Sequence, residues 1–571
     1  MLDEPSRQPT LCSFPPNFSI SWSTRFHRSN LPIWLGWLEG RKHVIRASKD
    51  GWLSVATIRR CDAKRPQCSQ CIKSKRVCAG YQREMIFVEA VVVGTRSTPK
   101  KPSPASTVFR PETIKALSTS RCKAPKQLPT LCNDTSISTN SGHASNGIPM
   151  DNDTFCQAQF RKQLLSAYIS SYIPEFVLGT SNGKPWLMSL PEVSSPTKAL
   201  EVSTAALCTA RLAFISGNDS LAAESRILYG SGLKELQHAL WDESQMYRDE
   251  TLAACMNLAF YELTECPGKS RYGYLNHHSG LATLVQLRGP GAFMSGLAHD
   301  VFSLFRVQAI LSALREHRTT YLSSSEWIQS PWSINAKSPI DQLVDFFAEA
   351  PGLYLAADQL KILGFPTVLE ASLDLIDRCW DLDDHLQQFF EDFAAKIPGP
   401  LYTPTLAKGL VAVDDKDLPK LFPVAFQFSN LQISGVTMWY WITSLLLWSG
   451  LFALYREVGE VMAGMTPDSP CPCLSCGQKA GSCSIKARLI NLRQLGEQRR
   501  DYLTLAWNVC QSFEYSTQDC MLGLGPASMA APLSIVLEQV KSHPDRDREV
   551  AWIKAALDIV RKRGMKYLGY Q

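Results

Sequence analysis

From about residue 155 onward, the chain contains a series of long stretches with the hydrophobic period of a helix. In each stretch apolar residues recur every three to four positions, which gives an α-helix one apolar face. Alternating patterns typical of strands are scarce. The sequence therefore predicts one all-α domain over residues 155–571, with helices over residues 160–174, 198–216, 222–241, 250–265, 272–287, 301–315, 366–393, 422–458, 485–513 and 549–565.

Residues 421–455 contain no charged side chain, which raises the question of a membrane span. About 20 apolar residues are enough to cross a bilayer. Two observations oppose a span: no second candidate segment is evident, and the run contains the polar residues Gln427, Asn430, Gln432, Thr437, Thr443 and Ser444. A helix at the centre of a large all-α domain explains the same composition. We therefore favour a buried helix and expect no membrane partner.

The residues that precede this domain have a different composition. Residues 1–55 contain Pro, Ser and Trp without a sustained period, which predicts an irregular N-terminal tail. Residues 95–153 are rich in Ser, Thr, Pro, Asn and Lys, and such a segment buries too little apolar surface to fold, so we expect a disordered linker. The formal net charge is only +6 over 571 residues. A nucleic-acid surface must therefore be a local group of Lys and Arg.

Between the tail and the linker lies a short basic unit, residues 56–85, that contains four cysteines spaced C-x6-C-x2-C-x6-C: Cys61, Cys68, Cys71 and Cys78. No apolar segment follows a basic start at the N-terminus, so we expect neither secretion nor disulfides. Two thiolates separated by two residues can reach one ion around a tight turn, as in half of a tetrahedral zinc site. Neighbouring Lys and Arg favour the thiolate form that binds metal. The unit therefore predicts one Zn²⁺ held by the four cysteines.

The run from residue 61 to residue 81 resembles the second half of the fungal binuclear zinc-cluster domain. Besides the cysteines, the run shares Asp62, Arg65, Pro66, Lys73, Ser74, Lys75, Arg76, Gly80 and Tyr81 with that pattern. In that family two halves, each spaced C-x2-C-x6-C, hold two zinc ions, and the first and fourth cysteines bridge both ions. The resemblance implies a nuclear regulator of RNA polymerase II transcription that binds promoter DNA, often as a homodimer.

The chain departs from this family in the first half of the cluster. At the family spacing the first two ligands fall at Gly51 and Ser54, which supply no thiolate. The residues that should read DNA bases are 55–58, and here they are Val, Ala, Thr and Ile. By this analogy a two-zinc cluster does not form. Either the first exon is mispredicted, which the irregular tail favours, or the regulator has lost its own DNA reader and acts through protein partners.

Basic side chains surround the predicted zinc site: Arg59, Arg60, Lys64, Arg65, Lys73, Lys75 and Arg76. Contacts to phosphates supply position and salt-dependent affinity, whereas contacts to base edges supply specificity. We expect these side chains to contact phosphates of double-stranded DNA. The protein as written should therefore bind DNA weakly and with little sequence preference.

The helical body resembles the fungal-specific regulatory domain that accompanies this zinc cluster. The resemblance covers about residues 155–540, and it rests on the order of weak motifs at residues 249–254, 274–280, 287–290, 304–307, 313–315 and 326–332. It implies an α-helical regulatory domain that contacts the transcription machinery or co-regulators. Many members of the family control a metabolite biosynthetic pathway, which is the process the resemblance suggests.

The sequence does not favour an enzyme. It contains no Gly-rich phosphate loop, G-x-S-x-G elbow or H-E-x-x-H motif. The neighbouring His277 and His278 could suggest a metal site. Adjacent positions on a helix point about 100° apart, however, so the two rings rarely share an ion. We interpret both as helical histidines whose hydrogen bonds are satisfied.

The cysteines outside the basic unit fall into two kinds. Cys208, Cys255 and Cys379 are scattered singly among apolar residues, which predicts core packing. A second group lies in a Pro/Gly-rich loop between two predicted helices and comprises Cys471, Cys473, Cys476 and Cys483. Its spacing suits zinc or a response to oxidants, and a flexible loop with incidental cysteines explains it equally well. We assign this group no function.

Overall fold

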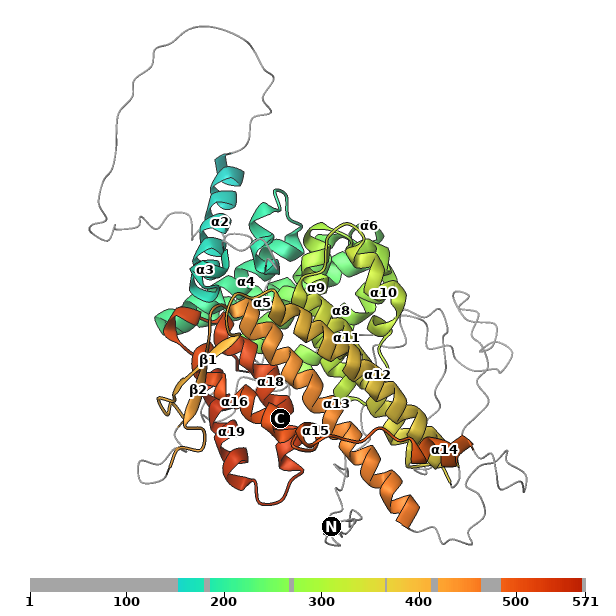
Figure 1. Cartoon of the computed structure of the whole chain (residues 1–571). Helices are drawn as coiled ribbons and strands as arrows, with labels where there is room; N and C mark the ends of the chain where they lie inside the picture. Colours follow the sequence, from blue (N-terminus) through green and yellow to red (C-terminus); the bar gives the residue numbers. More distant parts are fainter. Residues whose placement is uncertain are drawn as a thin grey trace, which may run out of the picture. The chain divides into compact units, whose positions relative to one another are not determined.

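The computed structural model describes residues 152–178, 185–265, 272–364, 367–411, 419–463 and 484–566. Within these ranges the chain is mostly α-helical, as predicted, with one short β-hairpin (Figure 1). The predicted tail, the basic cysteine unit and the linker up to residue 151 lie outside the described residues. The principal elements, in chain order, are α2 (Asn152–Tyr172), α3 (Glu175–Leu178), α4 (Lys198–Ser216), α5 (Asp219–Trp241), α6 (Glu243–Met246), α7 (Asp249–Glu265), α8 (Tyr272–Arg288), α9 (Gly296–Arg315), α10 (Ser325–Gln329), α11 (Pro339–Leu360), α12 (Thr367–Ala395), β1 (Tyr402–Leu406), β2 (Val424–Phe428), α13 (Leu431–Ala463), α14 (Ser484–Ile490), α15 (Glu497–Arg500), α16 (Leu503–Gln511), α17 (Phe513–Ser516), α18 (Leu524–Lys541) and α19 (Asp547–Lys562).

The first half of the described chain packs around α7, in which every side chain from Thr251 to Leu263 is buried. Helices α4, α5, α8 and α9 contact it. α4 begins after Thr197, whose hydroxyl accepts a backbone hydrogen bond from the first turn, and it ends at Gly217, whose left-handed conformation suits glycine. Gly232 lets α5 lie close to α7, because a Cβ there would be 3.2 Å from Cδ2 of Leu258. These features place α7 at the centre of a helical layer.

The second half packs around α13, which contains most of the charge-free run. Helices α11, α12, α16 and α18 contact α13 (Figure 1). Leu445 and Leu451 are fully buried, and the large side chain of Trp448 is 2% exposed. The prediction of a helix buried at the centre of the domain is therefore confirmed.

In the part of the chain that the structure describes, three helices are long and apolar enough to cross a membrane by length and composition alone: α4, α9 and residues 431–460 of α13. The expectation that the charge-free run would have no second candidate is therefore wrong, since all three reach a mean hydropathy of 1.3. In α4 and α9, 56% of the apolar window is buried inside the fold, and in α13 the share is 78%. Packing in the core accounts for the apolar composition of each helix.

A β-hairpin stands where the sequence predicted the start of a long helix at residue 422. Strand β2 pairs antiparallel with β1, and α13 begins only at Leu431. Asn430 caps the helix, since its side-chain oxygen accepts the backbone N–H of Ile433 at 2.9 Å. Phe426 of β2 packs against Trp441, with ring centroids 5.9 Å apart. The aromatic packing of β2 and the cap at Asn430 outweigh the helical period of residues 422–430, so the helix begins later than predicted.

Two core helices, α11 and α18, were not predicted. Each contains a buried proline within the helix, Pro351 in α11 and Pro532 in α18. Proline removes a helical hydrogen bond and clashes with the preceding turn, so the local pattern opposes a helix there. Tertiary packing outweighs this cost. Conversely, the helix predicted over residues 485–513 is divided into shorter helices from α14 to α17.

A buried ion pair connects α12, α13 and α15. Asp383 of α12 is fully buried, and its Oδ1 accepts a hydrogen bond from Nε1 of Trp448 at 2.6 Å. Its Oδ2 accepts two more from Arg499, at 2.8 Å from Nε and 2.6 Å from Nη2. Because the carboxylate is both paired and hydrogen-bonded, its burial is compensated.

Candidate functional site

The zinc and DNA residues predicted from the sequence lie outside the described residues: Cys61, Cys68, Cys71, Cys78, Arg59, Arg60, Lys64, Arg65, Lys73, Lys75 and Arg76. The second cysteine group, at residues 471–483, lies outside them as well. Among the described residues, no group of three or more His, Cys, Asp or Glu side chains could hold a metal ion. The zinc site therefore stays a prediction.

The scattered cysteines pack in the core, as predicted. Cys208, Cys255 and Cys379 are buried and free, and so is Cys510. Burial raises the pKa of the thiols of Cys255 and Cys379 to about 12, and it raises the pKa of Cys208 further. Since the thiolate is the form that attacks or binds metal, these four side chains are chemically inert at neutral pH.

His277 and His278 of α8 face different neighbours, as expected for adjacent positions on a helix. His277 Nε2 forms a hydrogen bond of 3.1 Å with the hydroxyl of Tyr229 on α5. The ring of His278 is buried and stacks on Phe305 of α9, with centroids 5.7 Å apart. Its Nε2 has no hydrogen-bond partner among the described residues. The prediction of satisfied histidines is therefore right for His277 and wrong for His278.

The pKa values of the two histidines are also shifted. Burial lowers the pKa of both to about 4, and for His278 the nearby Arg315 and Arg318 add to the effect. Both rings are therefore neutral at pH 7, and the unpartnered Nε2 of His278 carries no charge into the core.

Glu262 of α7 is a buried carboxyl that the sequence analysis did not single out. Its side chain is 5% exposed, and Oε1 accepts a hydrogen bond of 2.5 Å from the hydroxyl of Tyr229. Desolvation raises the pKa of Glu262. Tyr229 thus lies between Glu262 and His277, and we call these three residues the α7 polar cluster. They come from three different helices, and Tyr229 precedes Glu262 by 33 residues and His277 by 48, so no local motif could have indicated the cluster.

Gly273 at the start of α8 makes room for this cluster. A Cβ at that position would lie 2.4 Å from the carboxyl carbon of Glu262, closer than real Cβ contacts. Glycine at this position therefore leaves room for the Glu262 carboxyl that accepts a hydrogen bond from Tyr229. The cluster joins α5, α7 and α8 through hydrogen bonds, and its evident role is in packing.

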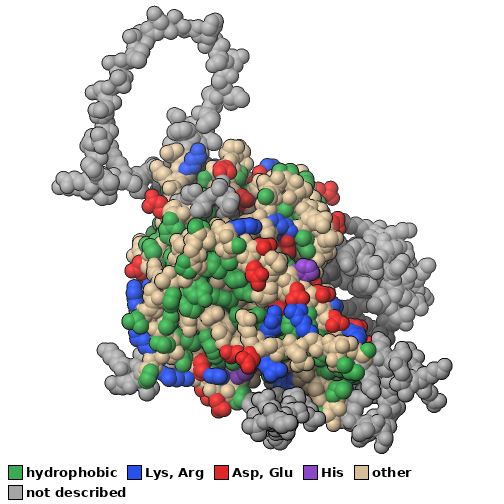
Figure 2. All heavy atoms as spheres, viewed as in Figure 1, with side chains coloured by type: hydrophobic (Ala, Val, Ile, Leu, Met, Phe, Trp, Pro, Cys, Tyr) green, Lys and Arg blue, Asp and Glu red, His purple; other side chains and the backbone are tan. Residues whose placement is uncertain are grey.

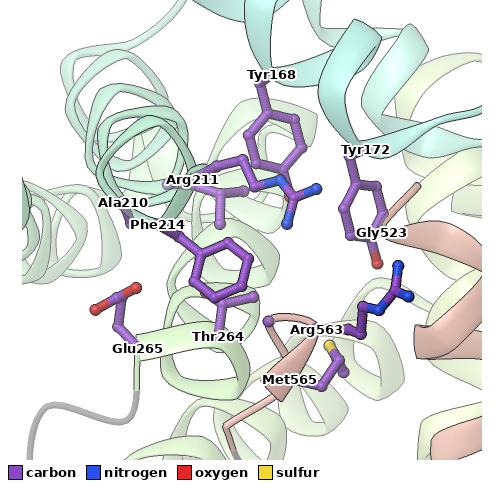
Figure 3. Close-up of a pocket in the computed structure, with 12 residues that line it drawn as sticks. Tyr168, Tyr172, Ala210, Arg211, Phe214, Thr264, Glu265, Gly523, Arg563 and Met565 are labelled. Carbon is purple, nitrogen blue, oxygen red and sulfur yellow. The ribbon is translucent and has the colours of Figure 1, made fainter. Parts of the chain in front are cut away.

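A small hollow lies where α2, α4, α7 and the residues after α19 meet (Figure 3). Arg211 of α4 forms part of its wall. Its Nη2 donates to the backbone carbonyl of Ser171 at 2.6 Å, and its guanidinium lies 5.6 Å from the ring centroid of Tyr172 and 5.4 Å from that of Phe214. Gly523 closes another side, because a Cβ there would lie 2.4 Å from the Tyr172 ring.

The size and charges of this hollow limit what it can bind. Its volume is about 10 Å³, about what one water molecule needs and far below the roughly 300–1,000 Å³ of small-molecule sites. Its charged rim is already engaged: Glu265 pairs with Lys566 at 3.0 Å, and Arg563 pairs with Asp519 at 3.1 Å. We therefore assign the hollow a structural role in joining the first helices to the last one.

Comparison with known proteins gives one match to a family. Residues 163–356, from within α2 to within α11, match the fungal specific transcription factor domain. An uncharacterized protein of Emericella nidulans is 29% identical over 168 residues, which are 29% of this chain and 36% of that relative. No solved structure matches the chain. The family match supports the predicted regulatory domain, and it does not include residues 61–78.

Proposed function

We propose that the chain is a DNA-binding regulator of RNA polymerase II transcription that acts in the nucleus. The observation that carries this proposal is the match of residues 163–356 to the fungal specific transcription factor domain. That match supports a transcription regulator rather than an enzyme. A basic unit with four cysteines at zinc-ligand spacing precedes the matched region. Pathway-specific control of a metabolite biosynthetic gene cluster is the process that the resemblance suggests.

In this proposal the basic unit supplies the contact with DNA. Cys61, Cys68, Cys71 and Cys78 hold one Zn²⁺, which fixes the fold of a segment too short to have its own core. The seven Lys and Arg side chains between residues 59 and 76 neutralise phosphates and release counterions. Base selection is weak, because residues 55–58 carry no side chain suited to hydrogen bonds with base edges, apart from one threonine.

A second candidate function is an accessory regulator that acts through protein partners without reading DNA. The observation in its favour is that Gly51 and Ser54 stand at the positions where the family has its first two zinc ligands. In both versions the helical domain contacts co-regulators or the transcription machinery. They differ in whether the basic unit binds DNA at all.

Metal analysis of the full chain tests the zinc site. We expect that Cys71→Ser lowers the zinc content by one ion per chain, because removal of one of four thiolates opens the tetrahedral shell. Cys520→Ser, at an exposed cysteine outside both cysteine groups, is the matched control and should leave the zinc content unchanged. Equal zinc content in the wild type and in Cys71→Ser would remove the zinc site from the proposal.

A gel-shift titration with and without chelator separates the two candidate functions. A DNA-binding regulator should lose affinity steeply with salt, with a log–log slope of up to about −6 if all seven basic side chains contact phosphates. Random and promoter duplexes should bind within about tenfold of each other. Absence of any chelator-sensitive binding favours the accessory regulator. Strong selection of one short element at physiological salt would contradict the weak base selection inferred for residues 55–58.

A further inference from the structure

A groove of about 320 Å³ opens between α12 and the segment formed by α14 and the residues that follow it. This volume is in the range of small-molecule binding sites. Side chains, rather than close backbone packing, join α14 to α12. Figure 2 shows acidic and basic side chains next to one another over the part of the surface where Figure 1 places α12.

The α12 wall of the groove is acidic. Asp374, Asp377, Asp381 and Asp384 recur every three or four residues, so they share one face of the helix. Across the groove, Arg488 pairs with Asp374 at 2.7 Å and with Asp377 at 2.5 Å, and Arg493 pairs with Asp384 at 2.7 Å. Among the described residues, Asp381 has no ion-pair partner although it lines the groove. Among the residues that line the groove, three carboxylates face two guanidinium groups, so the lining carries an excess of negative charge.

The floor of the groove is aromatic and already attracts cations. Trp380 lies under the guanidinium of Arg493, which is 3.8 Å from the centroid of its ring, and Arg499 lies 4.8 Å from the same centroid. The indole Nε1 donates to the hydroxyl of Tyr455 at 2.8 Å, which fixes the orientation of the ring. A cation above an indole face is stabilised by the ring quadrupole.

The ion pairs that close the groove are weak enough to yield to a competing ligand. Arg493 is 47% exposed and its partner Asp384 is 56% exposed. Exposed pairs of this kind contribute little to stability, because solvent and salt screen them. Hydrogen bonding from Arg493 lowers the pKa of Asp384, so this carboxyl stays ionised at neutral pH. A cationic ligand can therefore take the place of Arg493 at a preformed carboxylate and ring.

We propose that the groove between α12 and α14 binds a small organic cation, an amine or guanidinium compound with a short apolar body. Asp381 is the anchoring carboxylate, since it is the acidic side chain of the groove that no described cation neutralises. The apolar body lies against Leu373 and Leu492, and the Asn491 amide supplies a further hydrogen bond. This site is independent of the basic cysteine unit, so its failure would leave the proposed DNA-binding function unaffected.

Calorimetric titration of the full chain with agmatine tests the site. Asp381→Asn keeps the shape of the side chain and removes its charge, and we expect it to weaken agmatine binding at least tenfold. Glu391→Gln removes an exposed carboxylate from the same helix outside the groove and should leave binding within twofold of the wild type. Circular dichroism of each variant checks the fold.

Two further measurements sharpen this test. 1-Butanol, an uncharged probe with an apolar body, should not bind detectably, because the anchoring charge is missing. Agmatine affinity should fall severalfold between 0.05 and about 0.5 M salt, since the groove is open to solvent. Absence of agmatine binding at millimolar concentration, or equal affinities in Asp381→Asn and the wild type, would overturn the proposal.

Discussion

The two halves of the helical domain bury polar side chains in different ways. Around α7 burial shifts the pKa of buried side chains: desolvation raises the pKa of Glu262, and it lowers the pKa of His278 to about 4. Around α13 the buried group is paired, since Asp383 receives hydrogen bonds from both Arg499 and Trp448. The first half should therefore respond to pH, and the second half to loss of a partner.

The most deeply buried ion pair of each half also differs in how fully its hydrogen bonds are satisfied. In the first half Arg306 is fully buried and paired with Asp345, but its Nε and Nη1 have no partner among the described residues. In the second half both oxygens of Asp383 accept hydrogen bonds. An unsatisfied buried donor costs about 1–3 kcal/mol. The Arg306–Asp345 pair thus carries more uncompensated polarity than the pair formed by Asp383 and Arg499.

The largest effect is expected from Asp383→Ala. This change leaves Arg499 without its partner and Trp448 without its acceptor, and breaking a buried ion pair costs about 3–5 kcal/mol. Urea unfolding followed by circular dichroism measures the loss. Asp392→Ala, at an exposed position of the same helix, should change the free energy of unfolding by less than about 0.5 kcal/mol. A loss below about 1 kcal/mol in Asp383→Ala would show that the pair does not hold this half together.

A second effect should appear when the pH falls. The pKa of His278 and His277 is lowered from 6.5 to about 4 in the folded chain, so between these values the unfolded chain binds more protons. Stability is therefore full above about pH 6.5 and is lost as the pH falls toward 4. One pKa unit corresponds to about 1.4 kcal/mol, so His278 alone accounts for up to about 3 kcal/mol.

A substitution of His278 tests whether this loss of stability at low pH arises in the first half of the domain. His278→Phe keeps the stack on Phe305 and removes the titration, so stability measured between pH 4 and pH 7 should vary less than in the wild type. His385→Phe, at an exposed position of α12, serves as the control and should leave the curve unchanged. Parallel curves for His278→Phe and the wild type would place the pH sensitivity elsewhere.

The smallest effect comes from two glycines of α8. Gly273→Ala places a methyl group against Glu262 and should cost about 1–3 kcal/mol through overpacking. Gly280→Ala has open space around its Cβ and should gain about 0.5–1 kcal/mol, because alanine favours a helix. Thermal melts of the two variants should move in opposite directions. A shift of the same sign in both would mean that Gly273 is not needed to make room for the Glu262 carboxyl.

The fold was predictable wherever local period and tertiary packing agree. Residues 198–216 were predicted as a helix with the bounds that α4 has, since Thr197 and Gly217 cap it in the sequence as well as in space. The hydrophobic period did not predict the helices that contain Pro351 and Pro532, where burial stabilises a helix that the local sequence disfavours. It also failed at β2, where aromatic contacts with Trp441 select a strand.

The candidate sites also differ in whether the sequence alone could predict them. A zinc site formed by ligands within eighteen residues can be predicted from spacing alone, and the basic unit of residues 61–78 was found in this way. The groove beside Asp381 could not be predicted, because Arg488 and Arg493 come from more than 100 residues further along the chain. Neither could the α7 polar cluster, whose members meet only when three helices pack.

The burial of α13 has a consequence for how the protein is made. A ribosome synthesises residues 431–463 before α16 and α18, which cover α13 in the folded domain. Until residue 541 has left the exit tunnel, the nascent chain carries a partly covered helix, packed only by elements such as α11 and α12 and free of charge over residues 431–455. Such a surface invites aggregation, and it has the length and composition that targeting factors recognise in membrane spans. We therefore expect the nascent chain to depend on chaperones during translation, more so than the finished fold does.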